Sequence, residues 1–188
     1  MNNNSKSELR SQMKKIWQTQ LPNKSFLQKQ LAHQLFDFLK KQNGIWASYS
    51  ALLDEADPWP ICQNIKHLKW CLPRVISQDQ MQMHQVSAEM PNLEQNHLGL
   101  MEPMMNLPLV QPEQLTGLII PGMIFNQNGV RLGRGKGYYD RYLGRCRGIK
   151  VGLCFSFQII EEQIPNEAHD VRMDYLITEK EIISCSLL

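Results

Sequence analysis

Apolar residues near the start of the chain recur every three or four positions, which is the spacing of an amphipathic helix. Leu9, Met13 and Ile16 form one such stripe, and Ser5 precedes it as a candidate N-cap. The pattern therefore predicts a helix over residues 5–20.

After Pro22 a second helical pattern covers residues 25–41, and the pair Asn43-Gly44 predicts its C-cap. The pattern then changes to short apolar runs. The predicted strands cover residues 45–49, 69–73, 81–86, 117–121, 150–155 and 175–178, and the intervening helices cover residues 57–68 and 138–146. Strands that alternate with helices predict an α/β sheet that is covered on both faces.

The stretch from Val86 to Pro112 is rich in Pro, Asn and Met and has no sustained period beyond its first strand. It is longer than the connections that compact domains usually leave without structure. Three interpretations stay open at this point: a lid, a binding loop, or a segment with short elements that the pattern does not reveal.

Length and composition bound the class of protein. The 188 residues predict a single domain over 1–188. Apolar runs are far shorter than the ~20 residues that cross a bilayer, and the polar N-terminus lacks the apolar region of a secretory signal. We therefore expect a cytoplasmic chain without a membrane partner.

The cysteines and the net charge narrow the chemistry further. Five cysteines lie scattered without a CxxC pair, at positions Cys62, Cys71, Cys146, Cys154 and Cys185. This pattern predicts reduced, mostly buried thiols and no zinc site, because the histidines are scattered as well. The formal charge of +2 is too balanced for a dedicated nucleic-acid binder, so any anion site must be local.

The segment RLGRGKGYYDRYL, residues 131–143, alternates glycines with cationic side chains. Glycines between a buried strand and a helix let backbone N–H groups approach an anion closely, and the helix start adds positive partial charge. Arg131, Arg134 and Lys136 add point charges and forked donors that suit a polyphosphate. The spacing fits neither a P-loop nor a dinucleotide fingerprint. The segment therefore predicts a phosphate-binding loop of another kind.

Asp140 follows this loop in the first turn of the predicted helix. A carboxylate beside bound phosphates needs a cation between them, and Mg²⁺ prefers one or two carboxylates together with phosphate oxygens and water. Asp140 can instead be an ordinary helix carboxylate that pairs with Arg141 or Arg145. Spacing alone leaves both interpretations open.

Four further side chains, two in this motif and two near the start of the chain, have two interpretations each. Tyr138 and Tyr139 offer ring faces and hydroxyls to a planar ligand, or they pack in the core. Lys6 and Arg10, one helical turn apart, reach over the edge of the core toward a phosphate, or they face solvent.

Two acidic segments follow predicted strands. Residues 54–57 come after the first strand, where α/β proteins place ligand groups, although acidic helix starts are also common. Residues 165–179 contain His169, Asp170 and Asp174, of which Asp170 or Asp174 is a candidate metal ligand or a simple cap.

The motifs taken together resemble one family. KSELR, LLDEAD, CLPRV, GLMEP, PGMIFNQNGVRLGRGKGYYDRYL, VGLCFSFQ and IPNEAHDVRMDYLITE follow the order found in 5-formyltetrahydrofolate cyclo-ligases, also called 5,10-methenyltetrahydrofolate synthetases. The glycine-rich motif is specific, and the others are persuasive in their order. The resemblance implies a three-layer α/β/α sheet of the type shared with sugar-phosphate isomerases and CoA transferases.

The resemblance also implies site residues. The implied ATP site comprises Lys6, Arg10, Arg131, Leu132, Gly133, Arg134, Gly135, Lys136, Gly137, Tyr138 and Tyr139. The implied folate site comprises Ser50, Glu55, Tyr138 and Tyr139, and the implied Mg²⁺ ligands are Asp140 and Asp170. The residues that we expect to carry the catalysis are Arg134, Lys136 and Tyr139.

The family's reaction closes the ring of 5-formyltetrahydrofolate to 5,10-methenyltetrahydrofolate and releases ADP and phosphate. We expect folate and ATP as ligands, no nucleic-acid partner and a monomer. Two positions depart from the pattern of many relatives: Asn126 stands in place of an aspartate, and Thr116-Gly117 stands where an aspartate precedes the strand.

Two other functions stay open. An ATP-dependent relative can act on a different small molecule, because a fold and a phosphate site persist more readily than a substrate preference. GRGKGYY also resembles an arginine-glycine segment that binds RNA, although a single copy within an α/β pattern of near-neutral charge argues against it.

Overall fold

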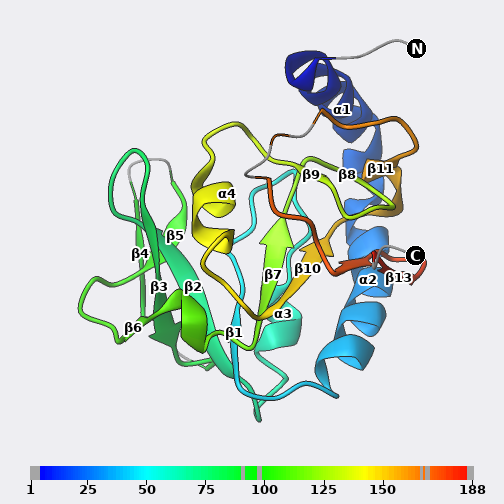
Figure 1. Ribbon diagram of the computed structural model, residues 1–188. Coiled ribbons are helices and arrows are strands. Elements are labelled where there is room, and N and C mark those ends of the chain that lie inside the picture. Colours follow the sequence, from blue (N-terminus) through cyan, green and yellow to red (C-terminus); the bar gives the residue numbers. More distant parts are fainter. Residues whose placement is uncertain (1–4, 90–91, 97–98, 166, 168–169, 186–188) are drawn as a thin grey trace.

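The computed structural model describes residues 5–89, 92–96, 99–165, 167 and 170–185, and within them the main sheet has eight strands (Figure 1). Their order is β13 (Ile182–Ser184), β12 (Tyr175–Ile177), β10 (Ile149–Leu153), β7 (Gly117–Pro121), β1 (Ile45–Ala47), β2 (Lys69–Val75), β3 (Met81–Val86) and β6 (Leu109–Val110). The five strands from β12 to β2 are parallel, whereas at the two edges β13 pairs antiparallel with β12, β3 with β2, and β6 with β3.

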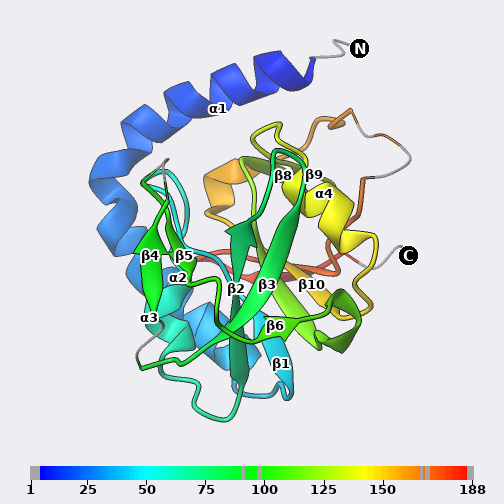
Figure 2. The same ribbon diagram turned by 90° about the vertical axis from the view of Figure 1, so that its left-hand side faces the viewer.

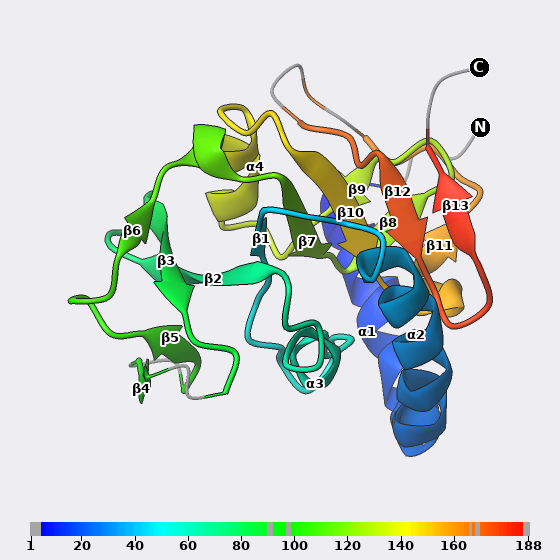
Figure 3. The ribbon, with the colours of Figure 1, turned by 90° about the horizontal axis from the view of Figure 1, so that it is seen from below.

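Both faces of the sheet are covered, as the alternation of strands and helices predicted. On β1, Trp46 belongs to one apolar core and its neighbour Ala47 to the other, because successive strand residues point to opposite faces. Figure 3 shows the helical arm of α1 (Lys6–Gln20) and α2 (Lys24–Leu39) on one side of the sheet and α4 (Tyr138–Leu143) on the other. The mixed α/β fold class is confirmed, while the likeness to isomerases and transferases stays a prediction.

The start of α1 is the predicted one. The Ser5 hydroxyl accepts a hydrogen bond from the Glu8 backbone N–H at 3.2 Å, and the Glu8 carboxylate accepts one from the Ser5 N–H at 2.7 Å. This reciprocal pair is a capping box. The buried stripe differs in one position: it is Trp17, 3% exposed, that packs with Leu9 and Met13, whereas Ile16 is 38% exposed.

The second helix begins earlier and ends earlier than predicted. A single turn, η1 (Leu21–Asn23), contains Pro22 and leads directly into α2. The C-cap is Lys40, so the prediction that Asn43-Gly44 caps this helix was wrong. Gly44 instead takes a positive φ of 82° in the connection to β1, a conformation that suits glycine.

The helix predicted over residues 57–68 shrinks to one turn, α3 (Trp59–Cys62). Beyond it, the N–H of Asn64 bonds to the carbonyl of Ile61 and the N–H of Ile65 to that of Cys62. These three-residue spacings are tighter than those of an α-helix, so the chain continues in turns until β2. The prediction failed because Ile65 and Leu68 are buried at helix-like spacing without a helix.

The long stretch before residue 112 contains short elements, which was one of the three open interpretations. The strands β4 (Leu93–Gln95) and β5 (Met101–Pro103) pair antiparallel, and β6 then joins the main sheet. A short turn, η2 (Pro112–Gln114), follows. Figure 2 shows β4 and β5 beside β2, to its left in this view.

A small second sheet stands above the carboxyl end of β7. It contains β11 (Ile159–Ile160), β8 (Ile124–Asn126) and β9 (Arg131–Leu132), in that order, and η3 (Ser156–Gln158) precedes β11. The glycine-rich loop connects β9 to α4. Helix α4 ends at Leu143 rather than near residue 146.

The prediction of reduced, buried thiols is confirmed for all five cysteines. None of the helices in the described part of the chain has the length and apolar character needed to cross a bilayer.

Candidate functional site

The candidate site lies at the carboxyl ends of β1 and β7. These strands are neighbours, with Trp46 beside Gly117, so the segments that follow them meet. Figure 1 shows both segments and the start of α1 on this side of the sheet. Open α/β sheets bind ligands at this edge.

Two glycines of the loop have backbone angles that other residues rarely adopt. Gly135 has a φ of 99° and Gly137 a φ of 70°. Gly137 is also the N-cap of α4, and a Cβ atom there would lie 2.6 Å from Arg141 Nη1. The alternation of glycines in the sequence therefore reflects a backbone requirement of this turn.

Arg131 is the most enclosed cation of the loop, with a side chain 5% exposed. Its Nη1 donates to the Pro121 carbonyl at 3.2 Å, its Nη2 pairs with Asp140, and its guanidinium lies 5.5 Å from the centroid of the Tyr139 ring. Its Nε is buried and has no hydrogen-bond partner among the described residues. Arg131 thus fixes the positions of Asp140 and Tyr139.

This arrangement corrects the predicted partner of Asp140. Neither Arg141 nor Arg145 pairs with it: Arg141 donates to the carbonyls of Asp79 and Lys136, and Arg145 pairs with Glu113 at 3.6 Å. The metal interpretation of Asp140 stays a prediction.

Arg134 connects the glycine-rich loop to the segment after β1. Its Nε donates to Glu55 Oε1 at 3.0 Å, and its Nη2 donates to Asp54 Oδ1 at 2.5 Å. Burial lowers the pKa of Arg134, but the hydrogen bond to Asp54 and the charge of Glu55 outweigh it, so the pKa lies above its usual value. Arg134 therefore stays charged, and two carboxylates bind it at once through different nitrogen atoms.

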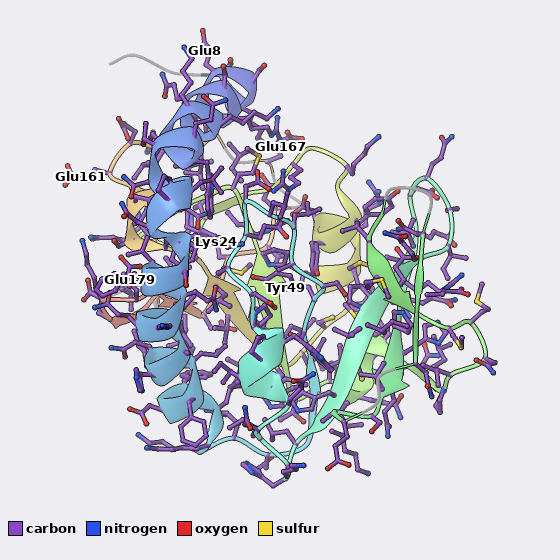
Figure 4. The ribbon with its side chains drawn as sticks, turned by 180° about the vertical axis from the view of Figure 1, so that it is seen from behind. Glu8, Lys24, Tyr49, Glu161, Glu167 and Glu179 are labelled. Atoms are coloured by element: carbon purple, nitrogen blue, oxygen red, sulfur yellow. The ribbon has the colours of Figure 1, made fainter. Side chains whose placement is uncertain are left out.

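Arg10 and Lys6 both face the site from the first turns of α1. Arg10 Nε donates to the Gly133 carbonyl at 2.8 Å, so this side chain contacts the loop. Lys6 Nζ pairs with Glu167 at 2.9 Å and with Asp170 at 3.3 Å. The hydrogen bond to Glu167, labelled beside α1 in Figure 4, is the largest cause of the raised pKa of Lys6.

Tyr138 and Tyr139 are half-buried and pack against the apolar core on the α4 side of the sheet. Their interpretation as core residues therefore holds in part. The Tyr138 hydroxyl donates to the Ser77 carbonyl at 3.3 Å. Burial and then the charge of Glu55 raise the pKa of Tyr139. The same two causes raise the pKa of the buried Tyr49, labelled in Figure 4, whose hydroxyl donates to the Ala56 carbonyl.

The other predicted site residues, Ser50 and Lys136, lie at the edge of the candidate site. The Ser50 hydroxyl donates to the Met101 carbonyl at 2.6 Å, which links β5 to the end of β1. Lys136 is exposed. The structure therefore joins Arg10, Gly133, Arg134 and Glu55 through direct hydrogen bonds, whereas Ser50 and the Lys6–Asp170 pair have other partners.

The sequence left Asp54 within an acidic segment that could supply ligand groups or start a helix, and it assigned no role to Lys24. Lys24, labelled in Figure 4 at the start of α2, donates to the Leu53 carbonyl at 2.7 Å, and burial lowers its pKa. The signal for Asp54 was present: an acidic run follows one buried strand, and a cationic, glycine-rich loop comes later in the chain between β9 and α4. Lys24 gave no signal, because only the packing of α2 brings it there.

The side chains of the site limit the kind of metal ion that it could bind. Among residues 5–89, 92–96, 99–165, 167 and 170–185, no group of three or more His, Cys, Asp or Glu side chains could hold an ion. Asp140 and Asp170 instead pair with Arg131 and Lys6. Single carboxylates fit Mg²⁺, which takes its other ligands from phosphate and water, and do not fit an all-protein cage.

Fold and site together define a class: a mixed α/β protein with a glycine-rich, arginine-bearing loop at the carboxyl edge of its parallel strands. The chain belongs to the 5-formyltetrahydrofolate cyclo-ligase family, whose model matches residues 2–179. The resemblance of the motifs is thereby confirmed.

Solved structures agree with this assignment. The chain is similar to 5,10-methenyltetrahydrofolate synthetase from Aquifex aeolicus, with a TM-score of 0.75 and 31% identity, over 97% of this chain and 96% of that one. The corresponding Mycoplasma pneumoniae protein gives a TM-score of 0.70 and 26% identity, over 95% and 99% of the two chains.

Sequence relatives carry related names over shorter segments. A probable 5-formyltetrahydrofolate cyclo-ligase of Schizosaccharomyces pombe is 31% identical over 60% of this chain and 62% of its own length. The cyclo-ligase of Mus musculus is 43% identical over 33% of each chain. The matched segments therefore span less than two thirds of these two relatives.

Proposed function

We propose that this chain converts 5-formyltetrahydrofolate and ATP into 5,10-methenyltetrahydrofolate, ADP and phosphate. The observation that carries the proposal is the hydrogen-bonded connection from Arg10 through the glycine-rich loop to Glu55, in a chain of the cyclo-ligase family. This connection joins two arginine side chains to a carboxylate within one network, which supports a site that binds both a polyphosphate and a polar ring.

The proposed ATP site uses the glycine-rich loop. Its members are Lys6, Arg10, Arg131, Leu132, Gly133, Arg134, Gly135, Lys136, Gly137, Tyr138 and Tyr139. The contact between Arg10 and the loop supports this grouping, and so does the exposure of Lys136, which leaves its ammonium group able to meet a phosphate. Cations that are already in place stabilise developing phosphate charge without reorganisation during the reaction.

The proposed folate site uses Ser50, Glu55, Tyr138 and Tyr139. Glu55 is close enough to Tyr139 to raise its pKa, so these two groups can border one ligand. A tyrosine hydroxyl is protonated at neutral pH even without a shift, and the raised pKa of Tyr139 favours this form further, so the hydroxyl can donate a hydrogen bond. The ring of Tyr139 offers an apolar face to a pterin.

The chemistry explains the residue types. The formyl oxygen of the substrate is a very poor leaving group. Transfer of the γ-phosphoryl group of ATP to this oxygen breaks the bond to ADP and turns the oxygen into part of a phosphate ester. The substrate's N10 then attacks the activated carbon and loses its proton to water or to the departing phosphate, and the C–O bond breaks as phosphate leaves with the electron pair. The protein's part is to orient both substrates and neutralise charge, with Arg134, Lys136 and Tyr139 nearest the reacting atoms.

We propose Asp140 and Asp170 as the protein ligands of Mg²⁺. When bound with ATP, the ion would neutralise phosphate charge. Arg131 and Lys6 pair with these carboxylates in the ligand-free protein, and a bound triphosphate offers both cations an alternative anion.

We also propose a single-domain monomer in the cytoplasm. Five buried, unpaired thiols suit a reducing compartment. Sedimentation equilibrium checks the monomer: it should give a mass near 21.8 kDa.

Turnover tests the proposed function. Purified protein with Mg-ATP and 5-formyltetrahydrofolate should develop the near-ultraviolet absorbance of the methenyl product and release one ADP per product. Omission of ATP is the control and should abolish the change. If the folded protein binds ATP but leaves this substrate unchanged, a relative that acts on another small molecule is the better description.

A further inference from the structure

We propose that Asp54 is a positioning residue for Arg134 and thereby sets the affinity for ATP. The inference rests on the proposed function and adds a residue outside the predicted site. Asp54 follows β1, whereas Arg134 lies in the glycine-rich loop, 80 residues further along the chain. Figure 1 shows both segments above the carboxyl end of β7.

The loop needs an anchor at this point. Arg134 lies between Gly133 and Gly135, and glycine backbones adopt many conformations when nothing holds them. Arg10 fixes the carbonyl of Gly133, and Arg141 fixes that of Lys136. The side chain of Arg134 supplies the tether in the middle, through its two carboxylate partners.

The two carboxylates are not equivalent. Glu55 is more enclosed, its Oε2 accepts from the Leu52 N–H at 3.0 Å, and it borders Tyr139. Asp54 is about one-third exposed, and in the described part of the chain Arg134 is the hydrogen-bond partner of its carboxylate. Glu55 can therefore turn toward a folate while Asp54 keeps Arg134 in place.

The N–H groups of Arg134 outside its two ion pairs explain how Asp54 can favour the binding of ATP. A guanidinium has five N–H groups, and the ion pairs occupy one on Nε and one on Nη2. The others stay free to meet a phosphate oxygen while Asp54 holds the group. Asp54 thus reduces the ordering that ATP binding must accomplish.

Steady-state kinetics of Asp54→Asn, Arg134→Gln and the double variant test the proposal. Asp54→Asn should raise the KM for Mg-ATP about three- to fivefold, as befits a partly exposed ion pair, and change kcat and the folate KM less than twofold. In the Arg134→Gln background the same substitution should change nothing further, because Asp54 acts through Arg134. An unchanged ATP KM in Asp54→Asn, or equal effects in both backgrounds, would overturn the proposal.

Hydrogen exchange of the ligand-free protein gives a second test that needs no activity. The amides of residues 133–137 should exchange faster in Asp54→Asn than in the wild type. Asp37→Asn, which removes one carboxylate from an exposed pair with Lys40, is the matched control and should leave them unchanged. Equal exchange in all three proteins would overturn the positioning role. Absence of wild-type turnover would overturn the proposed function instead, and the exchange comparison would still decide the role of Asp54.

Discussion

Arg10 on the first helix donates a 2.8 Å hydrogen bond from its Nε to the carbonyl of Gly133, 123 residues further along the chain. This bond pairs one loop carbonyl with a cationic donor from α1. It also keeps a guanidinium beside Gly135, whose Cβ position would lie 3.5 Å from the Arg10 Cζ. The N-terminal helix is therefore part of the candidate site.

Arg10→Ala should raise the KM for Mg-ATP about tenfold, because a hydrogen bond from a charged donor and a phosphate-facing cation are lost together. Lys14→Ala, one turn further along α1 on an exposed position, is the control and should stay within twofold of wild type. Initial rates at varied ATP concentration measure both. Equal KM values for the two variants would exclude Arg10 from the ATP site.

Gly137→Ala should destabilise the protein by about 1–2 kcal/mol, because alanine at a φ of 70° is strained. The added methyl group would also displace Arg141, whose Nη1 lies within 2.6 Å. Gly144→Ala is the matched control: its φ is −58° and nothing lies within 4 Å of the new atom. Urea unfolding measures both, and equal midpoints would show that the turn does not depend on glycine.

Asp140→Asn should reduce kcat at least a hundredfold and raise the Mg²⁺ concentration needed for half-maximal rate, if Asp140 is a metal ligand. The substitution also leaves the buried Arg131 without its carboxylate, so the free energy of unfolding should fall by about 1–3 kcal/mol. Rates across a Mg²⁺ titration separate the two effects. Lower stability with an unchanged Mg²⁺ dependence would make Asp140 only the partner of Arg131.

The thiols should resist modification in the native protein. Burial raises the pKa of Cys62 and Cys71 to about 12 and that of Cys146 and Cys185 to about 11. Few thiolates therefore exist at pH 8, and a thiol reagent should react at least a hundredfold more slowly than with the unfolded chain.

The raised pKa values of these thiols also predict how the stability of the protein depends on pH. Above pH ~8.5 the unfolded chain releases thiol protons that the native state retains, so the free energy of unfolding should fall as the pH rises toward 11. Urea unfolding between pH 8 and 10 checks the direction. A thiol that reacts as fast in the native protein as in urea would contradict its burial.

Local patterns predicted much of the fold. The strand at residues 81–86 and the strand at residues 117–121 match β3 and β7 at both ends, and Ser5 caps α1 as expected. These elements have a clear period or a specific cap. The helix expected over residues 57–68 failed because burial in turns imitates helical spacing, and β4 and β5 were missed because these three-residue strands contain no apolar run.

The parts of the candidate site that are encoded in one continuous stretch of sequence could be predicted. The glycine-rich loop could be recognised as a special turn, whereas Arg10 was assigned to the same site only through the family resemblance. The partners could not be predicted, because Arg131 meets Asp140 and Arg134 meets Asp54 through the arrangement of strands β1, β7 and β9. Side chains that can pair with several neighbours are assigned only when the tertiary structure brings one of them close.

Titration calorimetry with a Mg²⁺-bound, non-hydrolysable ATP analogue tests the central claim most directly, because it asks whether residues 131–139 hold a triphosphate. The wild type should bind one analogue per chain, and the double variant Arg134→Ala/Lys136→Ala should bind it at least tenfold more weakly while it remains folded by circular dichroism. A folded wild type that releases no binding heat with or without folate, or a variant of equal affinity, would contradict the account.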